Sequence, residues 1–134
     1  MDYLFLDANV LFSIAYGSRS PGVFQDLARQ GVCTLLASGY VLEEARRNLS
    51  QPQEWERLDQ LTAFLTIVLE GDVTIRCPIA LPDKEQPVFR AAANARATHL
   101  VTGDLRHFGV YMGKTIQGVY TCTPGDYLAM VQKP

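Results

Sequence analysis

The sequence predicts an α/β fold in which helices cover both faces of a central, mainly parallel sheet, giving a three-layer α/β/α arrangement. Residues 3–6 and 33–36 are hydrophobic without interruption, which is typical of strands that are buried on both faces. Segments with apolar residues at helical spacing alternate with the strands along the chain. This alternation favours parallel strands that are joined by helices.

The individual elements follow from apolar spacing and from the Gly and Pro residues between them. Strands are predicted over residues 3–6, 33–36, 98–101 and 114–121, with one or two further short strands within 66–70 and 73–77. Helices are predicted from near residue 10, over 21–30, 39–49, 84–96 and 124–132, and from residue 52 with apolar positions up to Leu65.

The composition predicts a single folded domain over residues 1–134, since the chain of 134 residues is 48% hydrophobic and 19% charged. Cys33, Cys77 and Cys122 lie far apart and form no C-x-x-C pair, so neither a zinc site nor a disulfide framework is indicated. No apolar run approaches the ~20 residues of a membrane helix, and no basic segment precedes the first strand. We therefore expect buried thiols in a cytoplasmic protein without membrane contact.

The formal net charge of −2 argues weakly against nucleic acid as a partner. Two divalent cations bound to four acids would add four positive charges and change the net charge to +2. An anionic substrate is therefore compatible with the acidic composition if the acids bind metal.

Two aspartates follow predicted strands. Asp7 comes directly after strand 3–6, and Asp104 follows the strand that ends at Val101. The carboxyl ends of parallel strands lie at one edge of a sheet, where such folds bind their ligands. A purely structural alternative stays open for each residue, because Asp7 or Asn9 could cap the next helix and Asp104 could belong to a turn.

Glu44 lies beside the apolar face of helix 39–49, so it can face the same edge of the sheet. Glu43 lies on the outer side, with Arg46 and Arg47 three and four residues later. Such spacing is typical of a solvated ion pair. We therefore expect a functional role for Glu44 alone.

Asp83 and Glu85 stand at the start of helix 84–96. The helix dipole alone favours acids at this position. The helix nevertheless leads into the Asp104 strand, so its first turn is expected at the same edge as Asp7.

Grouped carboxylates repel one another unless they bind cations. An all-oxygen set suits Mg²⁺ or Mn²⁺ better than zinc, and we interpret His99 and His107 as structural or peripheral. Carboxylate sites with one or two such ions commonly act on phosphates, where the metal activates water and stabilises the leaving oxygen.

Taken together, these motifs resemble the PIN domain family, in particular its small single-domain members similar to VapC-type toxin ribonucleases. The resemblance covers nearly the whole chain and is carried by residues 6–11 (LDANVL), 41–49 (VLEEARRNL), 87–92 (PVFRAA) and 100–104 (LVTGD). In the second motif the acid lies five residues before the leucine, which indicates Glu44.

The resemblance implies a Mg²⁺- or Mn²⁺-dependent endoribonuclease that hydrolyses single-stranded or looped RNA. The residues implied as metal ligands are Asp7, Glu44, Glu85 and Asp104. Asn9 would orient Asp7 by a hydrogen bond, and Thr102 would position a metal-bound water or the substrate phosphate. Arginines near the edge would bind backbone phosphates, an antitoxin protein would cover the site, and the protein would form a homodimer.

One position departs from the family pattern. Glu85 stands where the family usually has its third Asp, and Asp83 is a substitute two residues earlier. Glu can still bind a hard cation. The departure keeps open a non-catalytic PIN-like module that binds RNA or protein.

A phosphatase or phosphotransfer fold with an aspartyl nucleophile is a second alternative. The haloacid-dehalogenase type has another Asp two residues after the first, and Asn9 occupies that position here. A receiver domain needs a Lys that ends a late strand, whereas Lys114 begins one. Both alternatives fit the residues less well than a nuclease.

Overall fold

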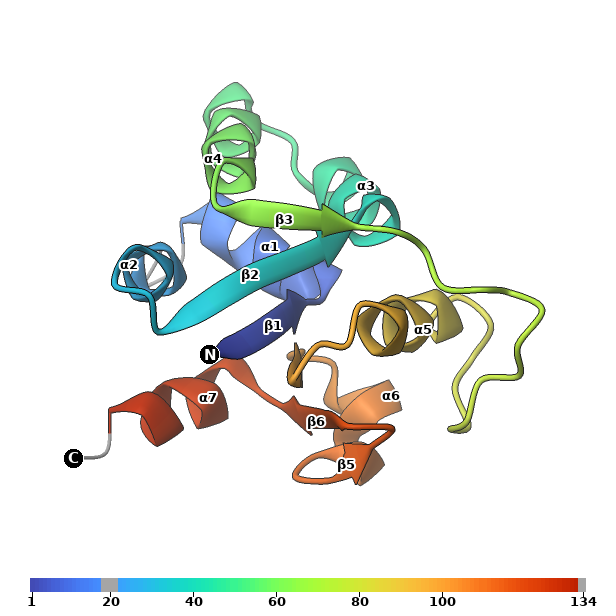
Figure 1. Cartoon of the computed structure of the whole chain (residues 1–134). Coiled ribbons are helices and arrows are strands. Elements are labelled where there is room, and N and C mark those ends of the chain that lie inside the picture. Colours follow the sequence, from blue (N-terminus) through green and yellow to red (C-terminus); the bar gives the residue numbers. More distant parts are fainter. Residues whose placement is uncertain (18–21, 133–134) are drawn as a thin grey trace.

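A six-stranded sheet forms the centre of the computed structural model, which describes residues 1–17 and 22–132 (Figure 1). The strand order is β3-β2-β1-β4-β6-β5, and only β5 runs antiparallel to its neighbour. The strands are β1 (Asp2–Leu6), β2 (Cys33–Ser38), β3 (Leu65–Val68), β4 (His99–Val101), β5 (Thr115–Ile116) and β6 (Val119–Cys122). The predicted, mainly parallel sheet is confirmed.

Helices flank this sheet and complete the three layers. They are α1 (Ala8–Tyr16), α2 (Val23–Arg29), α3 (Gly39–Asn48), α4 (Pro52–Thr62), α5 (Gln86–Asn94), α6 (Leu105–Phe108), the 3₁₀ turn η1 (Gly109–Tyr111) and α7 (Pro124–Val131). Helix α1 packs against α3 and α4, and lies behind β2 in Figure 1. The connection that contains α5 returns from β3, at one edge of the sheet, to β4. A right-handed crossover in this direction places α5 on the face of the sheet opposite to α1.

β1 lies in the middle of the core, and Leu4, Phe5 and Leu6 are fully buried. The chain leaves β1 toward β2 and later returns to β4 on the other side of β1. The two directions separate at the carboxyl ends of β1 and β4. Open α/β sheets bind their ligands at such a switch point.

Helix α4 is shorter than its apolar spacing predicts. It ends at Thr62, and Leu65 begins β3 instead of continuing the helix. Residues 65–68 read LTIV, and this β-branched run favours the extended strand that pairs with β2. The prediction that placed Leu65 on the helix is wrong.

Only one strand forms between residues 66 and 77. Asp72 accepts hydrogen bonds from the backbone amide and the hydroxyl of Thr74, at 2.9 Å and 2.6 Å. This local turn draws residues 73–77 out of an extended conformation. The possible second strand is therefore absent from this described segment.

The helix predicted over 84–96 is shorter at both ends and begins at Gln86. Glu85 lies in a preceding turn, where its backbone amide donates to the carbonyl of Pro82 at 2.9 Å. Pro87 lacks an amide hydrogen and is tolerated only in the first turn of a helix. Glu85 is therefore placed by a turn and not by a helix face.

The strand predicted over 114–121 is in fact a hairpin of β5 and β6. Gln117 and Gly118 both have positive φ, of 52° and 79°, which is the geometry of a tight two-residue hairpin turn. For the helix predicted over 21–30, Pro21 lies outside the described residues, and the described helix is α2.

All three cysteines are buried, as expected, and their thiols are free in the structure. Within the part of the chain that the structure describes, no helix combines the length and apolar character needed to cross a membrane.

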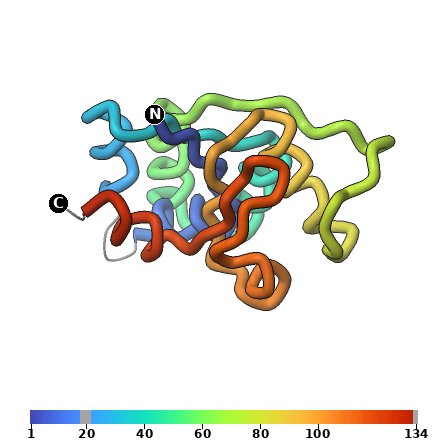
Figure 2. Tube along the Cα trace, turned by 60° about the horizontal axis from the view of Figure 1, so that its bottom comes forward, coloured from blue at the N-terminus to red at the C-terminus, as the bar shows by residue number. Residues whose placement is uncertain are grey.

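The connection from β3 to α5, residues 69–85, lies far from α7 in both Figure 1 and Figure 2. The hydroxyl of Tyr111 fastens it by donating to the carbonyl of Ala80 at 2.9 Å and accepting from its amide at 3.0 Å. Gly71 lies so close to α5 that an added Cβ would meet the Arg90 carbonyl oxygen at 2.7 Å.

Gly71→Ala is therefore expected to lower the free energy of unfolding by about 1–3 kcal/mol, because backbone must move to admit the methyl group. The control is Gly109→Ala, where a Cβ would meet nothing closer than 3.9 Å. Urea denaturation of both variants measures the effect. Equal stability of the two variants would show that the loop does not pack on α5 in this way.

Candidate metal centre

A cavity of about 530 Å³ opens at the carboxyl-end edge of the sheet. Its lining residues are Asp7, Ala8, Asn9, Phe12, Glu44, Asn48, Glu85, Gly103 and Asp104. The cavity thus brings together the four acids that were predicted as metal ligands. We call Asp7, Glu44, Glu85 and Asp104 the acid cluster.

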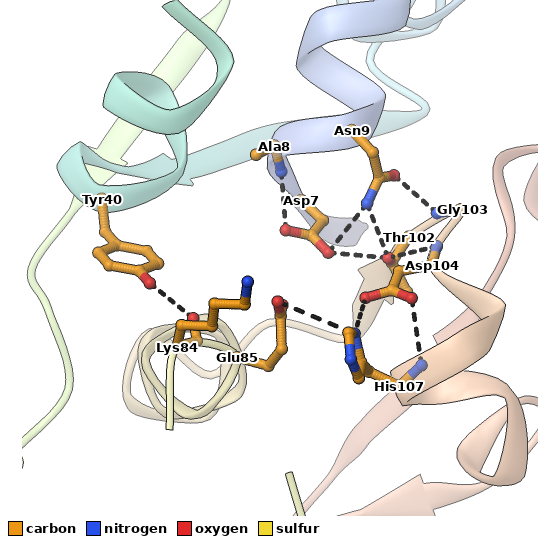
Figure 3. A network of polar contacts seen from close by, with 10 residues as sticks. All are labelled: Asp7, Ala8, Asn9, Tyr40, Lys84, Glu85, Thr102, Gly103, Asp104 and His107. Carbon is orange, nitrogen blue, oxygen red and sulfur yellow. Dashed lines mark hydrogen bonds and ion pairs between the residues drawn. The ribbon is translucent and has the colours of Figure 1, made fainter. Parts of the chain in front are cut away.

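Asp7 is only 2% exposed and caps the N-terminus of α1. One carboxylate oxygen, Oδ1, accepts from the amide of Ala8 at 2.7 Å. The other, Oδ2, accepts from the hydroxyl of Thr102 at 2.8 Å and from the side-chain amide of Asn9 at 3.2 Å (Figure 3). The Asp7 carboxylate therefore caps α1 and lines the cavity at the same time, so the structural and the functional interpretation do not exclude each other.

The Thr102 hydroxyl is fully buried, and its hydrogen-bonding capacity is already used. It donates to Asp7 and accepts from the amide of Asp104 at 3.1 Å and from Asn9 Nδ2 at 3.3 Å. A hydroxyl offers one donor and two acceptor sites. Thr102 therefore has no free atom for a water or a phosphate, and its contacts position Asp7 and Asp104 instead.

Asn9 links the same two strands. Its side-chain oxygen accepts from the Gly103 amide at 2.7 Å while its nitrogen contacts Asp7. A Cβ at Gly103 would come within 3.2 Å of that oxygen, so this close approach favours glycine. The ends of β1 and β4 are locked together by side chains as well as by the sheet.

Asp104 caps α6 and contacts His107, which was predicted to be structural or peripheral. Asp104 Oδ1 accepts from the His107 backbone amide at 3.1 Å, and Oδ2 lies 2.7 Å from His107 Nδ1. The same nitrogen lies 3.9 Å from Glu85 Oε1. His107 thus contacts two members of the acid cluster without lining the cavity itself. The signal that could have indicated this contact is its position three residues after the cap.

Glu85 is 9% exposed and reaches the cluster from the turn before α5. The Tyr40 hydroxyl of α3 holds this turn by donating to the Lys84 carbonyl at 2.6 Å. Figure 3 shows Glu85 directed toward His107 and Asp104. Asp83, in contrast, is exposed and does not line the cavity.

Helix α3 divides its two acids between the cavity and solvent. Glu44 is partly buried and lines the cavity. Glu43 is exposed and lies 3.9 Å from Arg47, whereas Arg46 pairs with Asp59 of α4 at 2.9 Å. The expected solvated pair of Glu43 therefore forms with Arg47 only.

His99 lies at the opposite end of β4 from Asp104, and its ring contacts Tyr120 and Tyr127 edge-on. Two cavity residues, Phe12 and Asn48, carried no recognisable signal in the sequence. Their position depends on how α1 and α3 pack together.

Burial raises the pKa of Asp7 above its ordinary value, against the lowering effect of the hydrogen bonds from Thr102 and Ala8; the charges of Glu44 and Asp104 raise it further. Burial likewise raises the pKa of Glu85, followed by the charges of Asp7, Asp104 and Glu44. The acids are therefore close enough to repel one another. A bound cation would relieve this repulsion.

A family model described as PIN domain matches residues 3–106. The chain belongs to the PIN domain family. A chain in the crystal structure of VapBC2 from Rickettsia felis, bound to a DNA fragment from their promoter, has a similar fold. That similarity has a TM-score of 0.61 at 17% sequence identity and covers 90% of this PIN domain chain and 98% of the other chain. No curated protein matches the sequence.

The donor set of this PIN domain fits a divalent cation. Glu85, Asp104 and His107 each offer a ligand atom, and these atoms all lie within 4.8 Å of one another. Carboxylate oxygens suit Mg²⁺ and Mn²⁺. The Asp7 carboxylate also keeps acceptor capacity, because an ionised carboxylate has about four lone-pair sites and three are used.

The raised pKa values predict a pH dependence of stability for the metal-free PIN domain. Asp7 and Glu85 bind protons more tightly in the folded protein than at their ordinary pKa values of 3.8 and 4.5. The free energy of unfolding should therefore fall as the pH rises from about 4 through the raised values. Asp104→Asn should show a smaller fall, because one of the charges that raise both pKa values is gone.

Chemical denaturation in chelator between pH 4 and 8 measures this difference. Asp83→Asn is the matched control, since it removes an exposed acid outside the cavity, and it should follow the wild type. Saturating Mg²⁺ or Mn²⁺ should restore stability at the upper end of the range. Identical pH profiles for the wild type and Asp104→Asn would contradict the mutual repulsion.

Proposed function

We propose that this chain acts as a single-domain, Mg²⁺- or Mn²⁺-dependent endoribonuclease that hydrolyses phosphodiester bonds in single-stranded or looped RNA. The convergence of the acid cluster on one open cavity, at the switch point of a PIN domain, is the observation that supports this most strongly. Within residues 1–17 and 22–132, Asp7, Glu85 and Asp104 form no salt bridge to Lys or Arg, and His107 is the basic side chain that contacts Asp104 and Glu85. Their charge is thereby available to a cation.

In this proposal Asp7, Glu44, Glu85 and Asp104 hold the metal. The bound ion would supply Lewis acidity, lowering the pKa of a water and stabilising charge on the phosphate oxygens. Asn9 and Thr102 position Asp7 and Asp104 without touching the substrate. Lys84 extends from the same turn as Glu85 (Figure 3), and its exposed ammonium would bind a backbone phosphate.

The acidic surface explains why the ion is needed for binding as well as chemistry. Without it, the cluster repels a phosphate. With it, the local charge becomes favourable to an anion. We expect the dependence of RNA binding on divalent ions to parallel the dependence of cleavage.

We further propose that the protein works in the cytoplasm as the toxin of a toxin–antitoxin pair and as a homodimer. The similarity in fold to a structure of VapBC2 supports this assignment. An antitoxin would inhibit by covering the cavity that holds the acid cluster.

A non-catalytic PIN-like module that binds RNA or protein is the second candidate function. The substitution of Glu85 for the usual Asp favours it. Two observations argue against a non-catalytic module: Glu85 is buried within the acid cluster, and like Asp104 it lies close to His107. An aspartyl phosphotransfer function is disfavoured further, because the Asn9 amide is engaged with Asp7, Thr102 and Gly103.

Cleavage of a mixed single-stranded RNA pool tests the proposal. The wild type should cut with Mg²⁺ or Mn²⁺ and not with chelator. Asp104→Asn should lose about 100-fold or more in rate, because loss of a direct metal ligand should cost at least as much as the roughly 10- to 100-fold lost with an outer partner of a ligand. Equal cutting by both preparations would identify a contaminant, and absence of both cutting and Mn²⁺ binding by the wild type would favour the non-catalytic module.

Glu85 has its own test. Glu85→Gln keeps the side-chain volume and removes the charge, so cleavage should fall by roughly 10- to 100-fold with weaker Mn²⁺ affinity. Glu85→Asp, which keeps the charge, should retain more activity than Glu85→Gln. Asp83→Asn should behave as the wild type in both assays; the opposite pattern, with Asp83→Asn impaired and Glu85→Gln unchanged, would assign the third ligand to Asp83.

A further inference from the structure

The cavity extends beyond the acid cluster along two helices. Helix α1 contributes Asn9 and then Phe12, and α3 contributes Glu44 and then Asn48. Residues three or four positions apart lie on one helix face, one turn from each other. Since α1 and α3 pack together, the next layer of the cavity after the acids is formed by Phe12 and Asn48.

Phe12 is an apolar ring in a cavity that is otherwise lined largely by polar side chains. Its ring stacks on Tyr16 one turn later, with centroids 5.4 Å apart and planes inclined by 19°. Tyr16 is 60% exposed, so the pair extends from the core to the surface. The aromatic pair therefore joins Phe12, which lines the cavity, to the exposed Tyr16.

Asn48 adds a neutral amide at the end of α3. Its side chain is exposed and lines the cavity with Phe12. An amide offers both hydrogen-bond donors and acceptors, the pair of groups that base edges also present. An aromatic face and an amide that line the same cavity are suited to a flat, polar-edged ring.

We infer that Phe12 and Asn48 form a subsite for one unpaired nucleobase, next to the phosphate that is cut at the acid cluster. This inference rests on the proposed ribonuclease function. Phe12, supported by Tyr16, stacks on the base, and Asn48 donates to or accepts from its edge. A base inside a duplex has neither its faces nor its pairing edge free, so the subsite restricts cleavage to single-stranded or looped RNA.

The volume agrees with this occupant. A cavity of about 530 Å³ lies within the range of roughly 300–1,000 Å³ that holds small ligands in proteins. It admits a nucleotide with its phosphate at the acidic end. Stacking is tolerant of base identity, and the amide of Asn48 adds a preference among bases.

The test uses the whole protein with Mn²⁺ and an RNA whose cut position has been mapped with the wild type. Two further RNAs lack the base on one side or the other of the cut. For the wild type, one abasic RNA should lower kcat/KM by about tenfold or more, in line with the cost of losing one base–aromatic stack. For Phe12→Leu, which keeps an apolar side chain but not the aromatic face, the same abasic RNA should lower it less than twofold.

Companion variants separate stacking from folding. Phe12→Trp should keep the full dependence on the base, and Asn48→Ala should change which base is preferred while keeping the abasic effect. Tyr3→Leu removes an exposed aromatic ring at the other end of β1 and should behave as the wild type. Mn²⁺ affinity should be unchanged in all four variants.

The outcomes distinguish the inference from the function beneath it. If the wild type cuts RNA and the abasic RNA lowers kcat/KM equally in the wild type and in Phe12→Leu, the subsite is overturned. The proposed nuclease function is then unaffected. A wild type that cuts no RNA overturns the function and the subsite together. If Phe12→Leu loses Mn²⁺ binding, the loss of kcat/KM on the abasic RNA is compared between Phe12→Trp and the wild type instead. Absence of this loss in Phe12→Trp would also overturn the inference.

Discussion

The buried carboxylate of Asp7 is the constraint on which the rest of the site depends. A carboxylate that is 2% exposed must be satisfied by hydrogen bonds or charge. Ala8, Asn9 and Thr102 supply the hydrogen bonds. Two of these donors belong to the start of α1 and one follows β4, so satisfying Asp7 fixes the first helix and the central strand pair at once.

The other acids are placed by elements that depend on this junction. Asp104 follows Thr102 by two residues, and its backbone amide donates to the same hydroxyl that supports Asp7. Glu85 comes from the opposite face of the sheet, through a turn that Tyr40 of α3 holds. With Glu44 of α3, four separate parts of the chain thus converge on one cavity. The resulting repulsion is expected to lower the stability of the metal-free protein, a cost that is typical of functional sites.

Sequence patterns predicted the fold and the placement of Asp7 and Asp104, because both depend on strands that end in polar residues. Glu44 and Glu85 were indicated by helix position and by the family resemblance. Asp7 and Asp104 follow apolar runs, and parallel strands bring such positions to one edge without further information. His107, Phe12 and Asn48 were missed for a physical reason. The contact of His107 depends on a four-residue helix, and the other two share a cavity only because α1 packs on α3. The hairpin turn at Gln117 and Gly118 depends on a positive φ at a non-glycine residue, which apolar spacing does not indicate.

The most direct test of this account is anomalous diffraction from crystals of the protein soaked in Mn²⁺. A peak is expected inside the cavity, with oxygens of Asp7, Glu44, Glu85 and Asp104 at metal-binding distance, and no peak is expected there in Asp104→Asn crystals. Ordered wild-type crystals with an empty cavity at saturating Mn²⁺, or with Mn²⁺ bound only elsewhere, would contradict the claim that these acids converge to hold a divalent cation.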